Sequence, residues 1–137
     1  MKDALAVINR ACTEHSVWGM IPLFSGGHDS YCACYVASKH PKFKGEVFHL
    51  DTTIGAQKAK KFVQQVCDDE GWRLRIYKNT NPNDTYEAIV RAAGFPGPPM
   101  HNRCYQRLKD RKISAITRAR NLVFGSKWML ITGCRSQ

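Results

Sequence analysis

The 137 residues suffice for one compact domain with one core. Hydrophobic residues make up 43% and charged residues 23% of the chain, as in globular proteins, and no apolar run is long enough to span a membrane. The net charge of +10 favours polyanionic partners, such as nucleotides, nucleic acids or other acidic surfaces, without choosing among them.

The N-terminal residues predict a helix followed by a short buried strand. Apolar residues recur at helical spacing over Met1–His15, which indicates an amphipathic helix. The apolar run Met20–Phe24 indicates a buried strand, and Pro22 marks one irregular or unpaired position within it. The loop Ser25–His28 follows this strand directly.

A second helix and a second strand come next. We expect Asp29 or Ser30 to cap a helix that runs to about His40. After a break, Glu46–Leu50 predicts a strand that ends at Asp51–Thr53.

The following segment, Ala56–Glu70, predicts an amphipathic helix that Gly71 ends. Its expected buried stripe consists of Phe62, Val63 and Val66. Its expected solvated face carries Lys58, Lys60 and Lys61.

The second half of the chain continues the alternation. Arg73–Tyr77 predicts a third strand, Asp84–Ala93 a short helix, and Gly94–Pro99 a loop. His101 to about Arg120 predicts a basic helix, and Trp128–Thr132 predicts the last strand.

Strands that alternate with helices predict an α/β fold. We expect a three-layer sandwich with a mostly parallel, doubly wound, Rossmann-like sheet of about four to five strands. Ligands of such sheets bind at the carboxyl ends of the strands. The segments Ser25–Ser30, Asp51–Gly55 and Gly133–Arg135 should meet there.

The loop Ser25-Gly26-Gly27-His28-Asp29-Ser30 suits a phosphate group. Two glycines allow positive φ and a close backbone approach, and successive N–H groups can form a concave anion site. The helix N-terminus adds partial positive charge, and two serine hydroxyls add donors. The spacing matches neither a Walker A loop nor G-x-G-x-x-G. His28 could contact phosphate or titrate near neutrality.

This S-G-G-x-D-S loop resembles the pyrophosphate loop (PP-loop) of the N-type ATP pyrophosphatases. Within that superfamily the chain is most similar to the 3′-phosphoadenosine 5′-phosphosulfate (PAPS) reductase branch. Three other segments are similar to that branch: Phe48-His49-Leu50-Asp51-Thr52, Arg103-Cys104-Tyr105-Gln106-Arg107-Leu108-Lys109 and Ile131-Thr132-Gly133-Cys134-Arg135-Ser136. The resemblance implies an adenine nucleotide alpha hydrolase-like fold.

The resemblance also implies a set of nucleotide-binding residues. They are Ser25, Gly26, Gly27, His28, Asp29, Ser30, Asp51, Thr52, Arg103, Lys109, Gly133 and Arg135. The loop would hold the sulfate or the β,γ-phosphates, and Asp51 with Thr52 would lie near the ribose and adenine. Arg103, Lys109 and Arg135 would neutralise phosphate charge, which agrees with the bidentate binding of anions by arginine.

The cysteines leave the chemistry open. The C-terminal E-C-G-x-H segment that carries the nucleophile of PAPS reductases is not in this sequence, so we expect residues 1–137 to form a single nucleotide-binding domain that is either a truncated version, a minimal version or a fragment of a longer protein. Cys104 stands between Arg103 and Arg107, whose charges would favour a nucleophilic thiolate and make it the candidate catalytic residue, but an ordinary buried or idle cysteine is the interpretation that we favour. Cys32 and Cys34 are expected to pack in the core.

Metal clusters and targeting signals are not indicated. No C-x-x-C pair occurs, so we expect no iron–sulfur cluster and no dedicated metal site, although ATP would bring Mg²⁺. The N-terminus has no signal-peptide pattern, so a cytoplasmic protein without membrane contact is expected.

Two functions remain open. In one, the chain is an enzyme that binds PAPS or ATP and acts on the sulfate or the α-phosphate, as a sulfonucleotide reductase (an oxidoreductase), a sulfotransferase-like transferase or an adenylylating ATP pyrophosphatase. In the other, it is a non-catalytic nucleotide- or nucleic-acid-binding module of a larger assembly. The basic run from Arg103 to Arg120 could serve either function.

Overall fold

A computed structural model describes residues 2–54, 57–95, 97–98 and 101–133. Its four strands are β1 (Gly19–Pro22), β2 (Glu46–Asp51), β3 (Arg73–Lys78) and β4 (Trp128–Ile131). The helices are α1 (Lys2–Glu14), α2 (His28–Ser38), α3 (Gln57–Asp69), α4 (Tyr86–Ala93), α5 (His101–Tyr105) and α6 (Arg111–Phe124). Two short elements complete the order, a 3₁₀ turn η1 (Pro82–Asp84) and a π-helical segment η3 (Gln106–Asp110) between α5 and α6.

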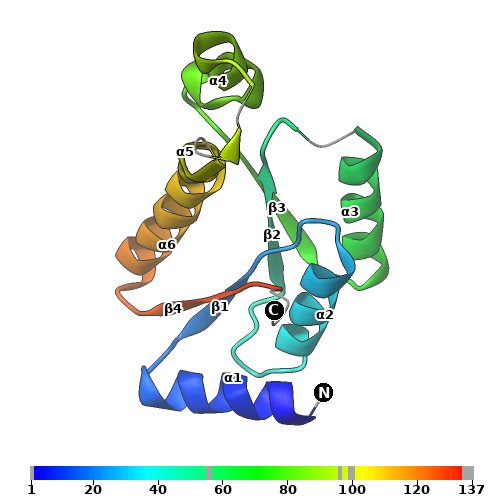
Figure 1. Ribbon diagram of the computed structural model, residues 1–137. Coiled ribbons are helices and arrows are strands. Elements are labelled where there is room, and N and C mark those ends of the chain that lie inside the picture. Colours follow the sequence, from blue (N-terminus) through cyan, green and yellow to red (C-terminus); the bar gives the residue numbers. More distant parts are fainter. Residues whose placement is uncertain (1, 55–56, 96, 99–100, 134–137) are drawn as a thin grey trace.

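The strands form two parallel pairs that meet side by side. β1 pairs with β4, and β2 pairs with β3, each in parallel. The pairs are joined by a parallel bridge between Leu23 and Phe48 and by a 2.8 Å hydrogen bond from the Phe24 N–H to the Phe48 carbonyl. The spatial order is therefore β3-β2-β1-β4, which confirms the predicted parallel α/β architecture (Figure 1).

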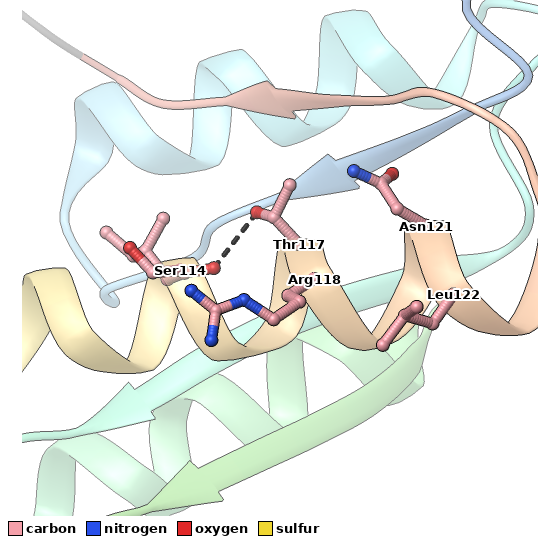
Figure 2. Close-up of a pocket in the computed structure, with 6 residues that line it drawn as sticks. Ser114, Thr117, Arg118, Asn121 and Leu122 are labelled. Atoms are coloured by element: carbon pink, nitrogen blue, oxygen red, sulfur yellow. Dashed lines mark hydrogen bonds between the residues drawn. The ribbon is translucent and has the colours of Figure 1, made fainter.

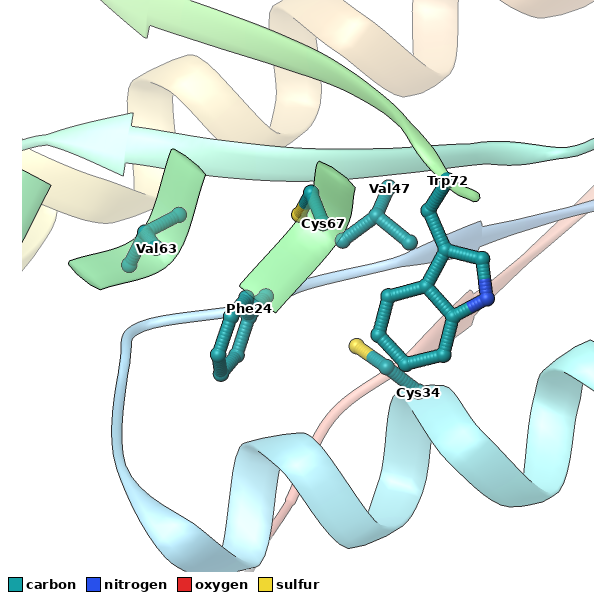
Figure 3. Close-up of a cluster of buried hydrophobic side chains, with 6 residues drawn as sticks. All are labelled: Phe24, Cys34, Val47, Val63, Cys67 and Trp72. Carbon is teal, nitrogen blue, oxygen red and sulfur yellow. The ribbon is translucent and has the colours of Figure 1, made fainter. Parts of the chain in front are cut away.

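Helices cover both faces of the strands, so the fold has three layers. On one face, α2 and α3 enclose a cluster of buried side chains (Figure 3): Phe24, Cys34, Val47, Val63, Cys67 and Trp72. On the other face, Ile116 of α6 packs on a second cluster: Ile21, Phe48 and Trp128. α1 packs beside α2, with Cys12 of α1 and Ala37 of α2 in one cluster with Met20 of β1.

Pro22 ends the regular part of β1. The predicted strand reached Phe24, but Pro22 has no N–H to donate, and the next donor, Leu23 N–H, bonds the Ile131 carbonyl at 2.9 Å. The irregular or unpaired position expected at Pro22 is not found in the pairing with β4, because Pro22 is the last residue of β1 and keeps Ile131 as its register partner.

The cap predicted for α2 was wrong. The helix begins at His28, its N-cap is Gly27, and no side chain caps it. Asp29 and Ser30 lie inside the first turn, where the Ser30 hydroxyl donates to the Gly27 carbonyl at 2.8 Å. The predicted start of α4 at Asp84 was also early, because the Thr85 hydroxyl caps that helix by accepting from the Ala88 N–H at 3.2 Å.

Two residues assigned to the core are exposed. Cys34 is fully buried, but Cys32 lies on the outward side of α2, because residues two positions apart on a helix point in different directions. Phe62 is 54% exposed, and Val63 carries the packing of α3 instead.

The amino end of β2 holds a buried carboxylate surrounded by arginines. Glu46 accepts from Arg75 at 2.8 Å and from Arg120 at 2.5 Å, with Arg73 at 3.6 Å. Burial by itself would raise the pKa of Glu46, but the bonds and charges of Arg75 and Arg120 outweigh it and lower the pKa.

Replacing Glu46 tests how much its contacts with the surrounding arginines stabilise the fold. Because the pKa of folded Glu46 is lowered, its contribution to stability is present above the unfolded value near 4.5 and is lost as the pH falls through the lower folded value. Glu46→Gln should therefore cost about 3 kcal/mol of unfolding free energy at neutral pH. Urea denaturation across pH should show the difference from wild type shrinking below 4.5; a difference independent of pH would contradict this account.

Candidate nucleotide cleft

A cavity of about 380 Å³ opens at the carboxyl ends of the strands. The strands and the segments that follow them contribute Leu23, Phe24, Ser25, Ser30, Phe48, His49, Leu50, Asp51, Thr52, Thr132 and Gly133. The helices contribute Ala59, Lys60, Tyr105, Lys109 and Ile113. This cavity, called the cleft below, is where parallel α/β folds bind ligands.

The loop 25–30 forms one wall of the cleft through its own hydrogen bonds. The Ser25 N–H donates to the Ser30 hydroxyl at 3.2 Å, and the two hydroxyls lie 3.0 Å apart. Gly26 has φ +91°, a conformation that side-chain-bearing residues rarely adopt, and a Cβ there would lie 3.1 Å from Val63 Cγ2. The loop therefore holds a fixed shape at the N-terminus of α2.

The last strand reaches the cleft because of a glycine. A Cβ on Gly133 would clash with the backbone carbonyl of Asp29 and would lie 2.5 Å from the Ser30 nitrogen. Only glycine lets the chain after β4 pass so close to the first turn of α2. This close approach places the β4 end beside the loop.

Asp51, at the end of β2, is buried and fully engaged. Its Oδ1 accepts from the Thr53 N–H at 3.0 Å, and its Oδ2 accepts from Lys60 Nζ at 2.6 Å. Burial would raise the pKa of Asp51, but these two bonds and the charges of Lys60 and Lys112 together lower it. The carboxylate is therefore ionised at neutral pH, and Lys60 is its partner.

Contacts from α6 and from α4 hold the turn after Asp51 in place. The ammonium of Lys112 on α6 donates to the Asp51 carbonyl, and burial lowers the pKa of Lys112 despite the opposing charges of Asp51 and Asp84. Thr53 has φ +64°, which is unusual for a β-branched residue. Its hydroxyl accepts from the Tyr86 N–H of α4 at 3.1 Å, which ties the turn to that helix.

The π-helical segment forms the remaining wall. Lys109 and Tyr105 both line the cleft, with Lys109 Nζ 5.8 Å from the centre of the Tyr105 ring. Arg107 of η3 donates to Asp84 Oδ1 at 2.8 Å, and Arg111, the first residue of α6, donates to Oδ2 at 2.9 Å. The pair anchors the π turn, a type of distortion found often at functional sites.

Comparison with solved structures identifies the fold. A crystal structure of phosphoadenylyl-sulfate (PAPS) reductase from Candida auris, a phosphate complex, superposes with a TM-score of 0.60 over 98% of this chain, at 15% sequence identity. The fold is that of PAPS reductase. This chain spans 62% of the length of the reductase chain. No family model matches the sequence, and no curated protein matches it.

The PAPS reductase-like fold brings together part of the predicted site. Six of the expected residues line the cleft: Ser25, Ser30, Asp51, Thr52, Lys109 and Gly133. Gly26, Gly27 and His28 line a second hollow of about 390 Å³ between α2 and α3. Asp29 lies in the first turn of α2 and is not among the lining residues of either hollow.

The remaining predicted residues lie elsewhere. Cys104 is buried in a small apolar cluster with Ile89 and Leu108 and does not line the cleft. Arg103 is exposed and is also outside the cleft lining. Arg135 lies outside the described residues.

Lys60 is a cleft residue that the sequence did not reveal. Lys60 was assigned to the solvated face of α3, but it lines the cleft and pairs with Asp51. Its position one turn beyond the helix start and nine residues after Asp51 was the available signal, although only the packing of α3 shows which lysine turns inward. His49 was also missed: it is buried in the cleft wall, where its Nδ1 donates to the Phe24 carbonyl at 2.8 Å.

Much of the basic run from Arg103 to Arg120 serves internal contacts. Arg107 and Arg111 bind Asp84, Lys112 binds the Asp51 carbonyl, and Arg120 binds Glu46. Because these side chains bind groups of the same chain, fewer cations of the run from Arg103 to Arg120 are left to contact nucleic acid. In the part of the chain that the structure describes, no helix is long and apolar enough to cross a membrane.

Alanine substitutions of the two loop glycines should differ. Gly26→Ala should cost about 1–2 kcal/mol of unfolding free energy, because alanine is strained at φ +91° and meets Val63. Gly27→Ala is the matched control: its φ is −89°, and the nearest atom to a Cβ is Ser25 Oγ at 3.6 Å. Equal loss of stability in both variants, measured by urea denaturation, would contradict this loop geometry.

Proposed function

We propose that this chain binds an adenine nucleotide, PAPS or ATP, in the cleft, with its phosphate or sulfate groups at the loop 25–30. The observation that carries the proposal is the cleft itself. One cavity at the carboxyl ends of β1, β2 and β4 has an ordered glycine-rich loop on one wall and two lysines on others.

The charges of the cleft support an anionic ligand. Lys60 and Lys109 line it from different helices, and the one carboxylate among the lining residues, Asp51, already binds Lys60. The N-terminus of α2 adds partial positive charge at the loop. A ligand with negative charges would therefore be favoured here, because Lys60 is already paired with Asp51 but Lys109 has no carboxylate partner among the described lining residues.

The fold suggests an orientation for the nucleotide. The phosphate or sulfate groups would contact the Ser25 and Ser30 hydroxyls and the loop N–H groups. The ribose and adenine would lie toward Asp51 and Thr52. Lys109 would neutralise phosphate charge, and Arg103 and Arg135 are further proposed partners for phosphate.

Two reactions agree with such a complex. With ATP, an acceptor attacks the α-phosphorus and pyrophosphate leaves. With PAPS, the chemistry occurs at the sulfate and needs a thiol donor. In either case catalysis would consist mainly of positioning and charge neutralisation. The buried location of Cys104 gives no reason to propose it as the donor.

Magnesium would enter with ATP. Among the described residues, no group of three or more His, Cys, Asp or Glu side chains could hold a metal alone. Both oxygens of Asp51 are occupied by Thr53 and Lys60. Mg²⁺ would therefore be held mostly by the nucleotide phosphates, as is usual for this ion, and Asp29, which is 41% exposed in the first turn of α2 and outside the cleft lining, is our candidate for one further contact.

A carboxylate placed in the loop tests the proposal directly. Gly27→Asp has room for its side chain, so the fold should persist, and its negative charge should repel phosphate. In calorimetric titrations with PAPS and with Mg-ATP, wild type and Gly27→Ala should bind at least one nucleotide. Gly27→Asp should lose that binding.

Which nucleotide binds then distinguishes the two proposed reactions. Preference for PAPS would indicate sulfonucleotide chemistry, and preference for Mg-ATP that is lost in EDTA would indicate adenylylation. If neither nucleotide binds to folded wild type, the proposed function is wrong.

Adjacent lysines on α3 provide a second test. Lys60→Met should weaken nucleotide binding by about ten-fold or more, because the cleft loses a cation and the buried Asp51 carboxylate loses its partner. Lys61→Met is the matched control, since Lys61 is exposed and does not line the cleft. Lys60→Arg should retain most of the affinity, which separates loss of charge from loss of packing. Equal affinities of the two methionine variants would remove Lys60 from the site.

A further inference from the structure

Buried polar side chains distinguish the cleft from the hollow that runs along α6. The α6 hollow, of about 540 Å³, is lined by exposed and half-buried residues, and its Thr117 hydroxyl donates to the Ile113 carbonyl of the same helix at 2.9 Å (Figure 2). The cleft lining includes three buried polar side chains, those of Ser30, His49 and Asp51. Burying a polar group costs free energy unless a hydrogen bond compensates for it. The partners of these three side chains therefore show where a ligand could still bond.

Only His49 keeps a polar atom without a partner. The Ser30 hydroxyl and both carboxylate oxygens of Asp51 bond other groups of the protein. His49 Nδ1 lies 2.8 Å from the Phe24 carbonyl oxygen, and because a carbonyl can only accept, Nδ1 carries a hydrogen. The other ring nitrogen, Nε2, has no partner among the described residues. It is not one of the side-chain atoms enclosed by protein either, so it faces the cleft that His49 lines.

A second buried histidine shows how a ring that serves only the fold is held. His40 and His49 are both 8% exposed. In His40 both nitrogens have partners, since Nε2 lies 2.7 Å from Asn9 Oδ1 and Nδ1 accepts from the Lys42 N–H at 3.1 Å. His40 is also not among the residues that line the cleft. The free nitrogen of His49 is therefore not a general consequence of burying a histidine in this protein.

The ring of His49 lies next to the glycine-rich loop. Its partner, the Phe24 carbonyl, directly precedes Ser25, and the side chains of Ser25 and Ser30 line the same cleft. An anion that bonds these two hydroxyls would therefore lie beside Nε2. The oxygens of an ionised sulfate or phosphate can only accept hydrogen bonds, and so can Nε2 in the neutral ring. A favourable contact thus requires a second proton on the ring, at Nε2.

We propose that His49 binds the phosphate or sulfate group at the loop through Nε2, and that the ring takes up a proton from solvent as the anion binds. This inference rests on the proposed function, because that function places the anion at the loop 25–30. It adds to the two lysines a cation that forms only in the complex. The charge of His49 would then follow the occupancy of the site.

The other charges of the cleft agree with such a change. Titratable side chains line it beside His49 from four elements: Asp51 of β2, Lys60 of α3, Tyr105 of α5 and Lys109 of η3. The carboxylate favours a protonated ring, and the two ammonium groups oppose it. One carboxylate against two ammonium groups favours the neutral ring without an anion, and an anion with two or more charges at the loop reverses this balance.

Spectra of the histidine rings test the proton uptake without any nucleotide. In ¹⁵N-labelled wild type at about pH 8, the upper end of the range in which histidine ordinarily titrates, the two ring nitrogens of His49 should have the widely separated shifts of a neutral ring. Sodium sulfate, which does not itself titrate near neutrality, should bring the two shifts together, as in an imidazolium. Sodium chloride at the same ionic strength should not, and His40 should respond to neither salt. A His49 ring that stays neutral at every sulfate concentration would overturn the proposal.

Replacing His49 by asparagine separates the roles of its two nitrogens. Asparagine can place a donor near the position of Nδ1 for the Phe24 carbonyl but has no group at the position of Nε2, so His49→Asn should fold. Its affinity for PAPS or Mg-ATP, whichever wild type binds, should fall by about ten-fold. His15→Asn is the control, since His15 is exposed and lies outside the cleft lining. A folded His49→Asn that binds as tightly as wild type would leave His49 with a structural role only and overturn the proposal.

The two experiments also separate this inference from the proposed function. If sulfate protonates the His49 ring but neither PAPS nor Mg-ATP binds, the anion contact is correct and the nucleotide function is wrong. If a nucleotide binds while the His49 ring stays neutral in sulfate and in the complex, the function is correct and the role of His49 is wrong. The spectra of wild type give this answer even if His49→Asn fails to fold.

Discussion

Two consecutive hydrogen bonds just before the glycine-rich loop hold the structure together. The Leu23 N–H bonds the Ile131 carbonyl of β4, and the Phe24 N–H bonds the Phe48 carbonyl of β2. The first bond lies within the β1–β4 pair and the second joins that pair to β2, so the chain is held from both sides where it approaches the loop. The carboxyl ends of β1, β2 and β4 consequently meet at one place, and the cleft forms between them.

Three buried carboxylates organise the basic residues around that framework. Glu46 gathers three arginines at the amino end of β2, Asp51 binds Lys60 at its carboxyl end, and Asp84 binds two arginines of the helix that forms the far wall. In each case the cations outweigh the cost of burial and lower the pKa of the acid. Part of the positive charge therefore stabilises the fold: Lys60 does so from within the cleft by pairing with Asp51, and Lys109 also lines the cleft.

The elements with strong local signals could be predicted, and those that depend on packing could not. The loop and the four strands were predictable because glycine spacing and short apolar runs are local properties. The inward direction of Lys60 depends on how α3 lies against β2, and the π turn at Gln106–Asp110 depends on Asp84, which lies 23 residues before Arg107 and holds it. Neither contact leaves a periodic pattern in the sequence.

The sequence by itself determined a parallel α/β fold with a glycine-rich loop after the first strand, because these features follow from hydrophobic periodicity and glycine conformation. Only the tertiary structure decided which side chains share the cleft. Cys104 turned into an apolar cluster, Lys60 turned toward Asp51, and Gly133 approached the first turn of α2. Burial and ion pairing between distant segments set these positions, and such contacts exist only once the layers have packed.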